Sequence, residues 1–268
     1  MATNRIDQRF DELRARGQKG FVAYITAGDP DLDATRRLAL AFERAGVDVL
    51  ELGVPFSDPL ADGVVNQLAA ERALKSGTTL PKILDTVRAL RAEGCRMPVV
   101  LFTYFNPVHR YGMEKFVPDA VAAGVDGLLA LDLPADETEP WQKLLADSTL
   151  HQIQLIAPTT TESRIAVITK QAGGFIYYVS REGVTGVQQQ LATNIAGMTA
   201  KIHKHTRVPV AVGFGVSTPE QAHAVAQHAE AVVVGSAIVD RVAKLNAARD
   251  MVEQVGAFVK SLVDAVKQ

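Results

Sequence analysis

The stretch with the most chemical potential is residues 47–67, which read VDVLELGVPFSDPLADGVVNQ. Glu51 lies near the end of an apolar run typical of a buried strand, and Asp62 lies in the polar, proline- and glycine-containing loop that follows. An acid among apolar neighbours beside a more solvated acid supplies two carboxylates with different pKa values, which suits general acid–base catalysis. The alternative is structural, with Glu51 ending a strand and Asp62 in an ordinary turn.

Two glycine-containing segments near the carboxyl end of the chain indicate a phosphate site. Gly215 ends the run VAVGFG, and Gly235 with Ser236 ends the next run, VVVGS. Glycine lets backbone N–H groups approach a ligand, and a helix that begins at Ser236 would direct its positive end to the same place. Together they predict a phosphorylated small-molecule substrate, although each glycine alone would also suit a plain turn.

Eight apolar runs alternate with helical segments and must position these residues. The predicted strands are in residues 20–30, 47–53, 97–107, 125–134, 151–159, 175–180, 207–215 and 229–242, the last running into a short helix at Ser236. Continuous apolar strands between helices are typical of a parallel sheet covered on both faces. We therefore predict a closed (β/α)8 TIM barrel with an extra N-terminal helix, a single domain over residues 1–268.

Helix starts are predicted from capping signals. Thr159 with Glu162, and Ser217 with Glu220, have the spacing of capping boxes. The helix after the Asp62 loop is expected over about 66–76. In a barrel of this kind the carboxyl ends of the strands carry the reactive groups, and we expect there Glu51, Asp62, Tyr104, Tyr177, Thr185, Gly186, Phe214, Gly215, Gly235 and Ser236.

Composition excludes several classes of function. Lys plus Arg total 28 and Asp plus Glu 30, so no basic surface predicts nucleic acid or an anionic membrane as partner. The single cysteine, Cys95, excludes an internal disulfide and a thiolate metal cluster, and the six histidines are too scattered to predict a metal. Without a signal-like or membrane-spanning run, we expect a soluble cytoplasmic protein.

The predicted strand ends also limit the reaction. They include no lysine for a Schiff base, and the chain has no GxSxG nucleophile motif. Of the mechanisms considered, acid–base catalysis by carboxylates is the one that the sequence still predicts.

Six long motifs, in order ELGVPFSDPLADG, LFTYFNP, IAPTT, FIYYVSREGVTG, VGFGVSTPEQ and VVVGSAIV, resemble the tryptophan synthase alpha chain family over almost the whole chain. The resemblance implies a reversible retro-aldol cleavage of indole-3-glycerol phosphate to indole and glyceraldehyde 3-phosphate, with no metal or organic cofactor. It also implies a beta-chain partner, in a heterotetramer of two alpha and two beta chains, that condenses indole with serine on its own pyridoxal phosphate.

The resemblance also implies roles for individual residues. Glu51 matches the general acid–base that protonates indole C3 and assists proton removal from the glycerol hydroxyl. Asp62 matches the acid that accepts a hydrogen bond from the indole N–H, and Thr185 matches the residue that meets this acid when its loop closes. Matches to the indole pocket are Phe102, Tyr104, Leu129, Tyr177 and Phe214, with barrel core as the alternative for each. Matches to the phosphate contacts are Gly186, Gly215, Gly235 and Ser236. Matches to the beta-chain contact are Pro55, Asp58 and Asn106.

One segment departs from the family pattern. After Gly63 the family usually has proline and then an apolar residue before glutamine, whereas this chain has Val64, Val65 and Asn66 before Gln67. Proline in the first helical turn would restrain the loop. We expect Asn66 to act as the N-cap instead, so that the helix begins one or two residues later.

Three alternatives remain open at this point. The chain could be a free-standing lyase, a regulatory barrel subunit with little turnover, or a phosphosugar isomerase on the same fold.

Overall fold

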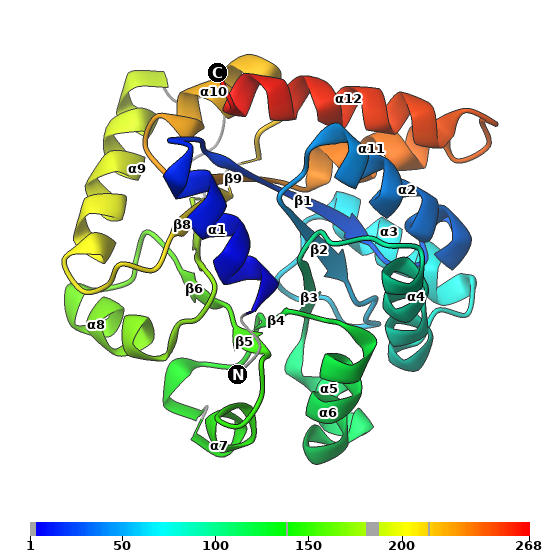
Figure 1. The fold of residues 1–268 in the computed structure, drawn as a ribbon, viewed down its shortest axis with the longest axis horizontal. Coiled ribbons are helices and arrows are strands. Elements are labelled where there is room, and N and C mark those ends of the chain that lie inside the picture. Colours follow the sequence, from blue (N-terminus) through cyan, green and yellow to red (C-terminus); the bar gives the residue numbers. More distant parts are fainter. Residues whose placement is uncertain (1–3, 138, 181–187, 214) are drawn as a thin grey trace.

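The computed structural model describes residues 4–137, 139–180, 188–213 and 215–268. Within these ranges nine parallel strands form one sheet that curls into a nearly closed barrel, with helices around it (Figure 1). The strands are β1 (Gly20–Thr26), β2 (Val49–Gly53), β3 (Val99–Thr103), β4 (Gly127–Ala130), β5 (His151–Gln152), β6 (Gln154–Ile156), β7 (Ile176–Val179), β8 (Val210–Gly213) and β9 (Ala231–Val234). The predicted TIM barrel is confirmed.

The helices lie outside the barrel, except for α1 at one end. They are α1 (Arg5–Ala15), α2 (Leu32–Ala45), α3 (Val64–Lys75), α4 (Leu80–Ala92), α5 (Phe105–Tyr111), α6 (Met113–Ala123), α7 (Glu139–Leu145), α8 (Glu162–Gln171), α9 (Gln188–His203), α10 (Pro219–Ala226), α11 (Ser236–Leu245) and α12 (Met251–Val266), with a 3-10 turn at Ala135–Glu137. Across the described ranges, none of them combines the length and apolar character needed to cross a membrane.

The fifth predicted strand is divided, which raises the strand count from eight to nine. β5 pairs with β4, and β6 pairs with β7. Ile153 lies between β5 and β6, donates its N–H to the carbonyl of Leu128 at 2.8 Å, and is buried inside the barrel. The segment therefore changes partner at Ile153, and this change joins the two ends of the sheet.

Side chains alternate between the barrel interior and the layer beneath the helices. On β2, Val49 belongs to the interior cluster, whereas Leu50 and Leu52 pack with the helices. The buried apolar residues of α1, Ile6 and Phe10 among them, join the same interior cluster. The predicted N-terminal helix thus closes the amino-terminal end of the barrel, where Figure 1 shows α1 lying across the strands.

Three acidic residues at that end cap neighbouring strands. Asp48, Asp126 and Glu230 each precede a strand and accept the first or second N–H of the adjacent strand, at 2.7, 2.8 and 2.9 Å. The Asp126 carboxylate also forms ion pairs with Arg5 and Arg91, with N–O distances of 2.7 and 2.9 Å. Because Asp126 is 3% exposed, these bonds replace the water that its charge would otherwise require. The ion pairs attach α1 and α4 to the sheet.

Three predicted helix starts are wrong. α3 begins at Val64 with Gly63 as its N-cap, because Gly63 is already extended (φ −73°, ψ 162°) and the Asn66 N–H bonds to Gly63 within the first turn. α8 has Thr161 rather than Thr159 before it. α10 is capped by Thr218 rather than Ser217, since Pro219 occupies the first helical position and Thr218 accepts from the Gln221 N–H at 3.3 Å.

The third predicted strand, 97–107, is too long. β3 ends at Thr103, and α5, which the sequence did not reveal, begins at Phe105 with Pro107 in its first turn. The helix tolerates a proline at this position because the N–H groups of the first turn have no partner within the helix.

Removing the Asp126 carboxylate should strongly destabilise the barrel. We expect Asp126→Ala to lower the free energy of unfolding by about 3 kcal/mol, because it removes the carboxylate partner of the largely buried Arg91 side chain and leaves the Val99 N–H unpaired. Urea unfolding measures this change. The control is Asp11→Ala, which breaks an exposed pair with Arg14 and should cost under about 1 kcal/mol. Equal losses in both variants would contradict the role of Asp126.

Proline should fit at position 64. Val64 is the first residue of α3, and the extended Gly63 suits a residue that precedes proline. We expect Val64→Pro to raise the free energy of unfolding by about 0.5–1 kcal/mol by restricting the unfolded chain, with reduced mobility of the Asp62 loop. The control Val65→Pro should destabilise, since it forces Val64 out of its helical conformation. Unchanged stability and loop exchange in Val64→Pro would refute this expectation.

Candidate active site

A cavity of about 350 Å³ opens at the carboxyl end of the barrel strands. This size lies within the range of small-molecule sites, and the position is where such barrels carry their reactive groups. Its lining residues come from most of the strands and from α3 and α11: Tyr24, Gly63, Val64, Val65, Asn66, Phe102, Tyr177, Val179, Ser180, Gly213, Gly215, Val233, Gly235 and Ser236.

Glu51 lies inside the barrel on β2, two residues after the inward-facing Val49 and in register with Tyr24 of β1. Its exposed fraction is 0%, and neither carboxyl oxygen has a hydrogen-bond partner among the described residues. Loss of water disfavours the charged form, so burial raises the pKa of Glu51 from its ordinary value near 4.5 to about 8. The side chain therefore carries a proton at neutral pH.

Glu51 lies close to the cavity although its own atoms are covered. Its charge contributes to raising the pKa of both Tyr24 and Tyr177, whose first cause is burial, and both tyrosines line the cavity. The charge of Asp62 also contributes to the raised pKa of Tyr24. The two carboxylates are thus brought to one site.

Asp62 is held in the loop before α3 and is half-buried. The Tyr104 hydroxyl accepts from the Ala61 N–H and donates to Asp62 Oδ2, both at 2.8 Å, and Gln67 Nε2 donates to the Asp62 carbonyl at 2.8 Å. Burial raises the pKa of Asp62, and hydrogen bonds from Tyr104 and Asn66 lower it in part. The predicted contrast is present: one acid is fully buried without partners, the other more solvated and bonded.

Two glycines make room for the tyrosines. A Cβ atom on Gly53 would collide with the ring of Tyr24, and one on Gly213 would collide with the ring of Tyr177. Tyr24, Gly53 and Gly213 were not among the predicted site residues, although each lies on the inward side of its strand. The inward alternation along the strands was the signal that could have found them.

Three of the four predicted phosphate residues, Gly215, Gly235 and Ser236, line the cavity. Gly215 has φ +68°, a left-handed conformation that favours glycine. Gly235 is the N-cap of α11, and Ser236 is its first residue, so the positive end of a ten-residue helix faces the cavity lining. Gly186, Thr185 and Phe214 lie outside the described residues.

The predicted indole-pocket residues separate into three groups. Phe102 and Tyr177 line the cavity, and the Phe102 ring packs edge-on against Tyr24 with centroids 5.0 Å apart. Tyr104 is not part of the cavity lining, but its hydroxyl donates a hydrogen bond to Asp62. Leu129 is fully buried in the interior cluster and is not part of the cavity lining, so the structure places it in the barrel core.

Residues predicted at a partner contact lie on the outside of the same end. Asp58 and Asn106 are exposed, whereas Pro55 is buried. Nearby, Leu60, Val64 and Leu68 are 94%, 69% and 48% exposed. Val64 and Leu68 are one turn apart on α3, and Leu60 precedes them in the Asp62 loop. We call Leu60, Val64 and Leu68 the apolar patch.

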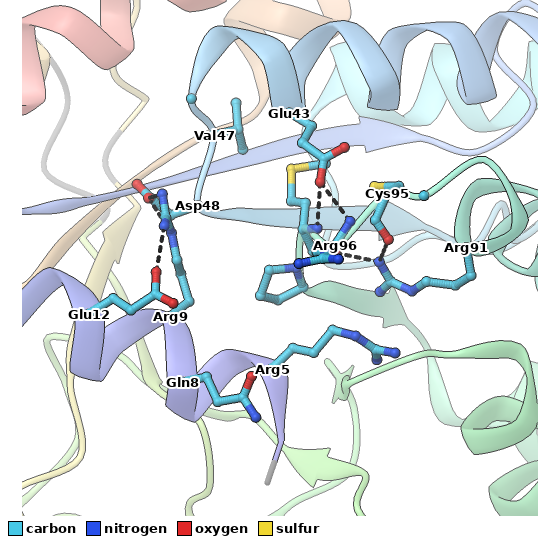
Figure 2. Close-up of a pocket in the computed structure, with 14 residues that line it drawn as sticks. Arg5, Gln8, Arg9, Glu12, Glu43, Val47, Asp48, Arg91, Cys95 and Arg96 are labelled. Carbon is cyan, nitrogen blue, oxygen red and sulfur yellow. Dashed lines mark hydrogen bonds and ion pairs between the residues drawn. The ribbon is translucent and has the colours of Figure 1, made fainter. Parts of the chain in front are cut away.

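A larger cavity, about 760 Å³, opens at the opposite end of the barrel (Figure 2). Three of its charged groups, Arg9, Asp48 and Glu12, form ion pairs among themselves. Arg9 contacts Asp48 and Glu12 at 2.7 and 2.9 Å, and Glu43 accepts the backbone N–H of Arg96 at 2.6 Å. The amino-terminal end of such barrels contributes to stability, and these ion pairs fit that role. In the part of the chain that the structure describes, no group of three or more His, Cys, Asp or Glu residues could hold a metal.

Comparison with known proteins identifies the family. The model of the family "Tryptophan synthase alpha chain" matches residues 10–267. The chain belongs to this family. Alpha chains of Geobacter sp. (strain M21) and Geobacter sulfurreducens are 49% and 48% identical to it over 263 residues, which is 98% of this chain and 98% and 99% of theirs. The crystal structure of the alpha subunit from Legionella pneumophila str. Paris superposes with a TM-score of 0.92 at 37% identity, covering 99% of each chain.

Membership establishes the reaction class. The chain is a carbon–carbon lyase of tryptophan biosynthesis that cleaves indole-3-glycerol phosphate by a retro-aldol reaction, and its family implies a beta-chain partner. The predicted family, fold class and lyase function are confirmed, and the isomerase alternative is excluded.

The buried Glu51 should make stability depend on pH. Its folded-state pKa is raised, so the folded chain binds the extra proton between pH 4.5 and about 8 and loses stability as pH rises through that window. We expect Glu51→Gln to gain stability relative to the unmodified chain by about 1.4 kcal/mol per pH unit across it. Urea unfolding at pH 5.5 and 7.5 measures the difference. If the stability difference between Glu51→Gln and the unmodified chain is the same at both pH values, the raised pKa of Glu51 is contradicted. The control is Glu71→Gln, at an exposed position of α3.

Proposed function

We propose that Glu51 and Asp62 carry out the cleavage and that Glu51 carries the proton in both directions. The observation that supports this most is the burial of Glu51 without a partner, because a carboxyl group that is protonated at neutral pH can act as a general acid. Both of its oxygens are covered, so the side chain must turn toward the cavity to reach the substrate.

Glu51 both donates and accepts a proton in the proposed cycle. As the acid, it protonates indole C3 and becomes a carboxylate. The carboxylate then accepts the proton of the hydroxyl on the glycerol carbon bonded to C3. The electrons of the O–H bond form the aldehyde carbonyl, and the C–C bond breaks to leave indole and glyceraldehyde 3-phosphate. Glu51 ends the cycle protonated, so one residue serves both steps and no redox partner is needed.

Asp62 stabilises the intermediate charge. Protonation at C3 makes the ring an indoleninium, and an ionised carboxylate that accepts the indole N–H hydrogen bond offsets this positive charge. Tyr104 fixes the Asp62 side chain through the 2.8 Å bond to Oδ2. A half-buried acid retains more of its negative charge than a fully buried one, so the difference in burial suits the two different roles.

The remaining cavity residues bind the substrate. The phosphate lies at Gly215, Gly235 and Ser236, at the amino end of α11, and the indole ring lies against Phe102 and Tyr177. Thr185, Gly186 and Phe214 belong to the same proposal through the family resemblance alone.

The beta chain binds at the exterior of this end, on Asp58, Asn106 and the apolar patch. Three exposed apolar side chains within nine residues favour a contact surface for a partner, and Leu60 lies in the loop that holds Asp62. Contact there would order that loop. We propose a heterotetramer of two alpha and two beta chains, with pyridoxal phosphate on the beta chain and no cofactor on this one, in the cytoplasm.

The test is indole release from indole-3-glycerol phosphate by the purified chain, with and without a beta chain. We expect slow release alone and a large increase with the partner. Glu51→Gln and Asp62→Asn should each reduce turnover at least about 100-fold while substrate binding is retained. Glu71→Gln should match the unmodified chain.

Each other outcome has a distinct meaning. Fast release that the beta chain does not change would indicate a free-standing lyase. Full activation of the beta chain by Glu51→Gln, together with unchanged slow turnover, would indicate a regulatory subunit. Both results would overturn the proposed roles.

A further inference from the structure

Tyr24 lies between Glu51 and the cavity. The two residues are register partners on the neighbouring strands β1 and β2, and each comes two positions after an inward-facing valine, Val22 or Val49. Tyr24 lines the cavity, whereas Glu51 is not part of the lining and is fully buried. A layer of the barrel that contains Tyr24 therefore separates the carboxyl group from the space proposed for the substrate.

The position of the Tyr24 ring is shown by Gly53, which follows Glu51 by two residues on the same face of β2. A Cβ atom on Gly53 would collide with Tyr24 Oη and lie only 2.7 Å from Cζ and 2.9 Å from Cε2. The far end of the ring thus occupies the place of the missing side chain. Because residues i and i+2 are neighbours on one face of a strand, the ring covers β2 on the cavity side of Glu51.

Packing, more than the hydroxyl group, holds this ring in place. The Phe102 ring contacts it edge-on with centroids 5.0 Å apart, and Ala69 of α3 and Val239 of α11 belong to the same buried cluster. The hydroxyl forms a hydrogen bond with Thr26 Oγ1 at 3.3 Å, which is long for two hydroxyl groups. The ring is therefore the part of Tyr24 that forms a cover.

We propose that Tyr24 is a positioning residue for the lyase reaction, whose ring covers Glu51 and keeps the water of the cavity away from its carboxyl group, so that Glu51 retains the proton that it delivers to the substrate. This inference rests on the proposed role of Glu51 as the acid. It assigns Tyr24 no proton transfer.

The groups that face Glu51 make this role measurable. Its register partner on β3 is the apolar Val100, and the ionisable side chains that respond to its charge are Tyr24 of β1 and Tyr177 of β7. The charge of Asp62 acts on Tyr24 but is not among the causes of the Glu51 shift. Burial alone raises the pKa of Glu51 to about 8. Access of water to the carboxyl group should therefore lower this pKa toward its ordinary value.

The experiment compares Tyr24→Ala, Gly53→Ala and Tyr24→Phe in the complex with the beta chain. Tyr24→Ala removes the ring, and Gly53→Ala displaces it with a methyl group. Because the protonated form of Glu51 is required, kcat/KM for indole release falls as the pH rises through its pKa. We expect this basic limb to move down by about one pH unit in both alanine variants, which is a tenfold weaker affinity for the proton. Tyr24→Phe keeps the ring and should restore the limb of the unmodified chain.

A second measurement does not depend on catalysis. The raised pKa of Glu51 makes the folded chain lose stability as the pH rises from 4.5 to about 8. Urea unfolding of the chain alone at pH 5.5 and 7.5 measures this loss, taken relative to the same variant with Glu51→Gln. We expect a smaller loss in Tyr24→Ala and in Gly53→Ala. Gly53→Ala should add no further change to Tyr24→Ala, because no ring is left to displace.

Tyr111→Ala is the matched control. It also removes a tyrosine ring that is packed and hydrogen-bonded, in this case against Phe116 with centroids 6.0 Å apart and to Asp119 at 2.6 Å. Tyr111 belongs to α5, outside the barrel. We expect this variant to keep the basic limb and the pH-dependent loss of the unmodified chain. Thermal unfolding shows that each variant is folded.

The outcomes separate this inference from the function on which it rests. If the folded Tyr24→Ala and Gly53→Ala variants keep the basic limb and the pH-dependent loss, the ring does not cover Glu51 and the inference fails. A loss of rate that is equal at every pH, or a shift in Tyr24→Phe as large as in Tyr24→Ala, would also overturn it. If Glu51→Gln keeps full activity, the proposed function of Glu51 fails, and the unfolding measurement still decides whether Tyr24 covers this residue.

Discussion

The burial of one carboxyl group without any hydrogen-bond partner is the constraint on which the site in this barrel depends. Glu51 is fully covered and its two oxygens are unpaired in the described part of the molecule. Burying it as an anion would cost far more than the fold gains from one side chain, so the group stays protonated. A site that needs a proton donor at neutral pH obtains it from desolvation alone, at the expense of stability.

The two ends of the barrel handle charge in opposite ways. At the amino end, buried acids such as Asp48 and Asp126 are paired with arginines and with strand N–H groups, and the pairs with Arg9 and Arg5 attach α1. At the carboxyl end, Glu51 has no such partner, and Asp62 has hydrogen-bond donors but no cation. Paired acids stabilise the framework, and unpaired acids are available for chemistry.

The Asp62 loop joins the proposed catalytic acid to the molecular surface. The Asp62 side chain accepts a hydrogen bond from Tyr104, and Leu60 of the same loop is exposed. A partner that covers the apolar patch would restrict the same few residues that orient Asp62. Assembly would then affect the proposed role of Asp62 more than that of Glu51, because Asp62 lies on the loop and Glu51 lies on β2.

The sequence by itself determined the alternation of strands and helices, the barrel and the family, and it predicted the two acids, since periodicity and long motifs are local properties of the chain. Only the tertiary structure decided that Ile153 changes strand partner, that Gly53 and Gly213 make room for tyrosines, and that Gly63 rather than Asn66 is the N-cap of α3. Those features depend on the direction of side chains and on the distance between segments far apart in sequence. Both are set when the barrel closes, and no local pattern of residue types records them.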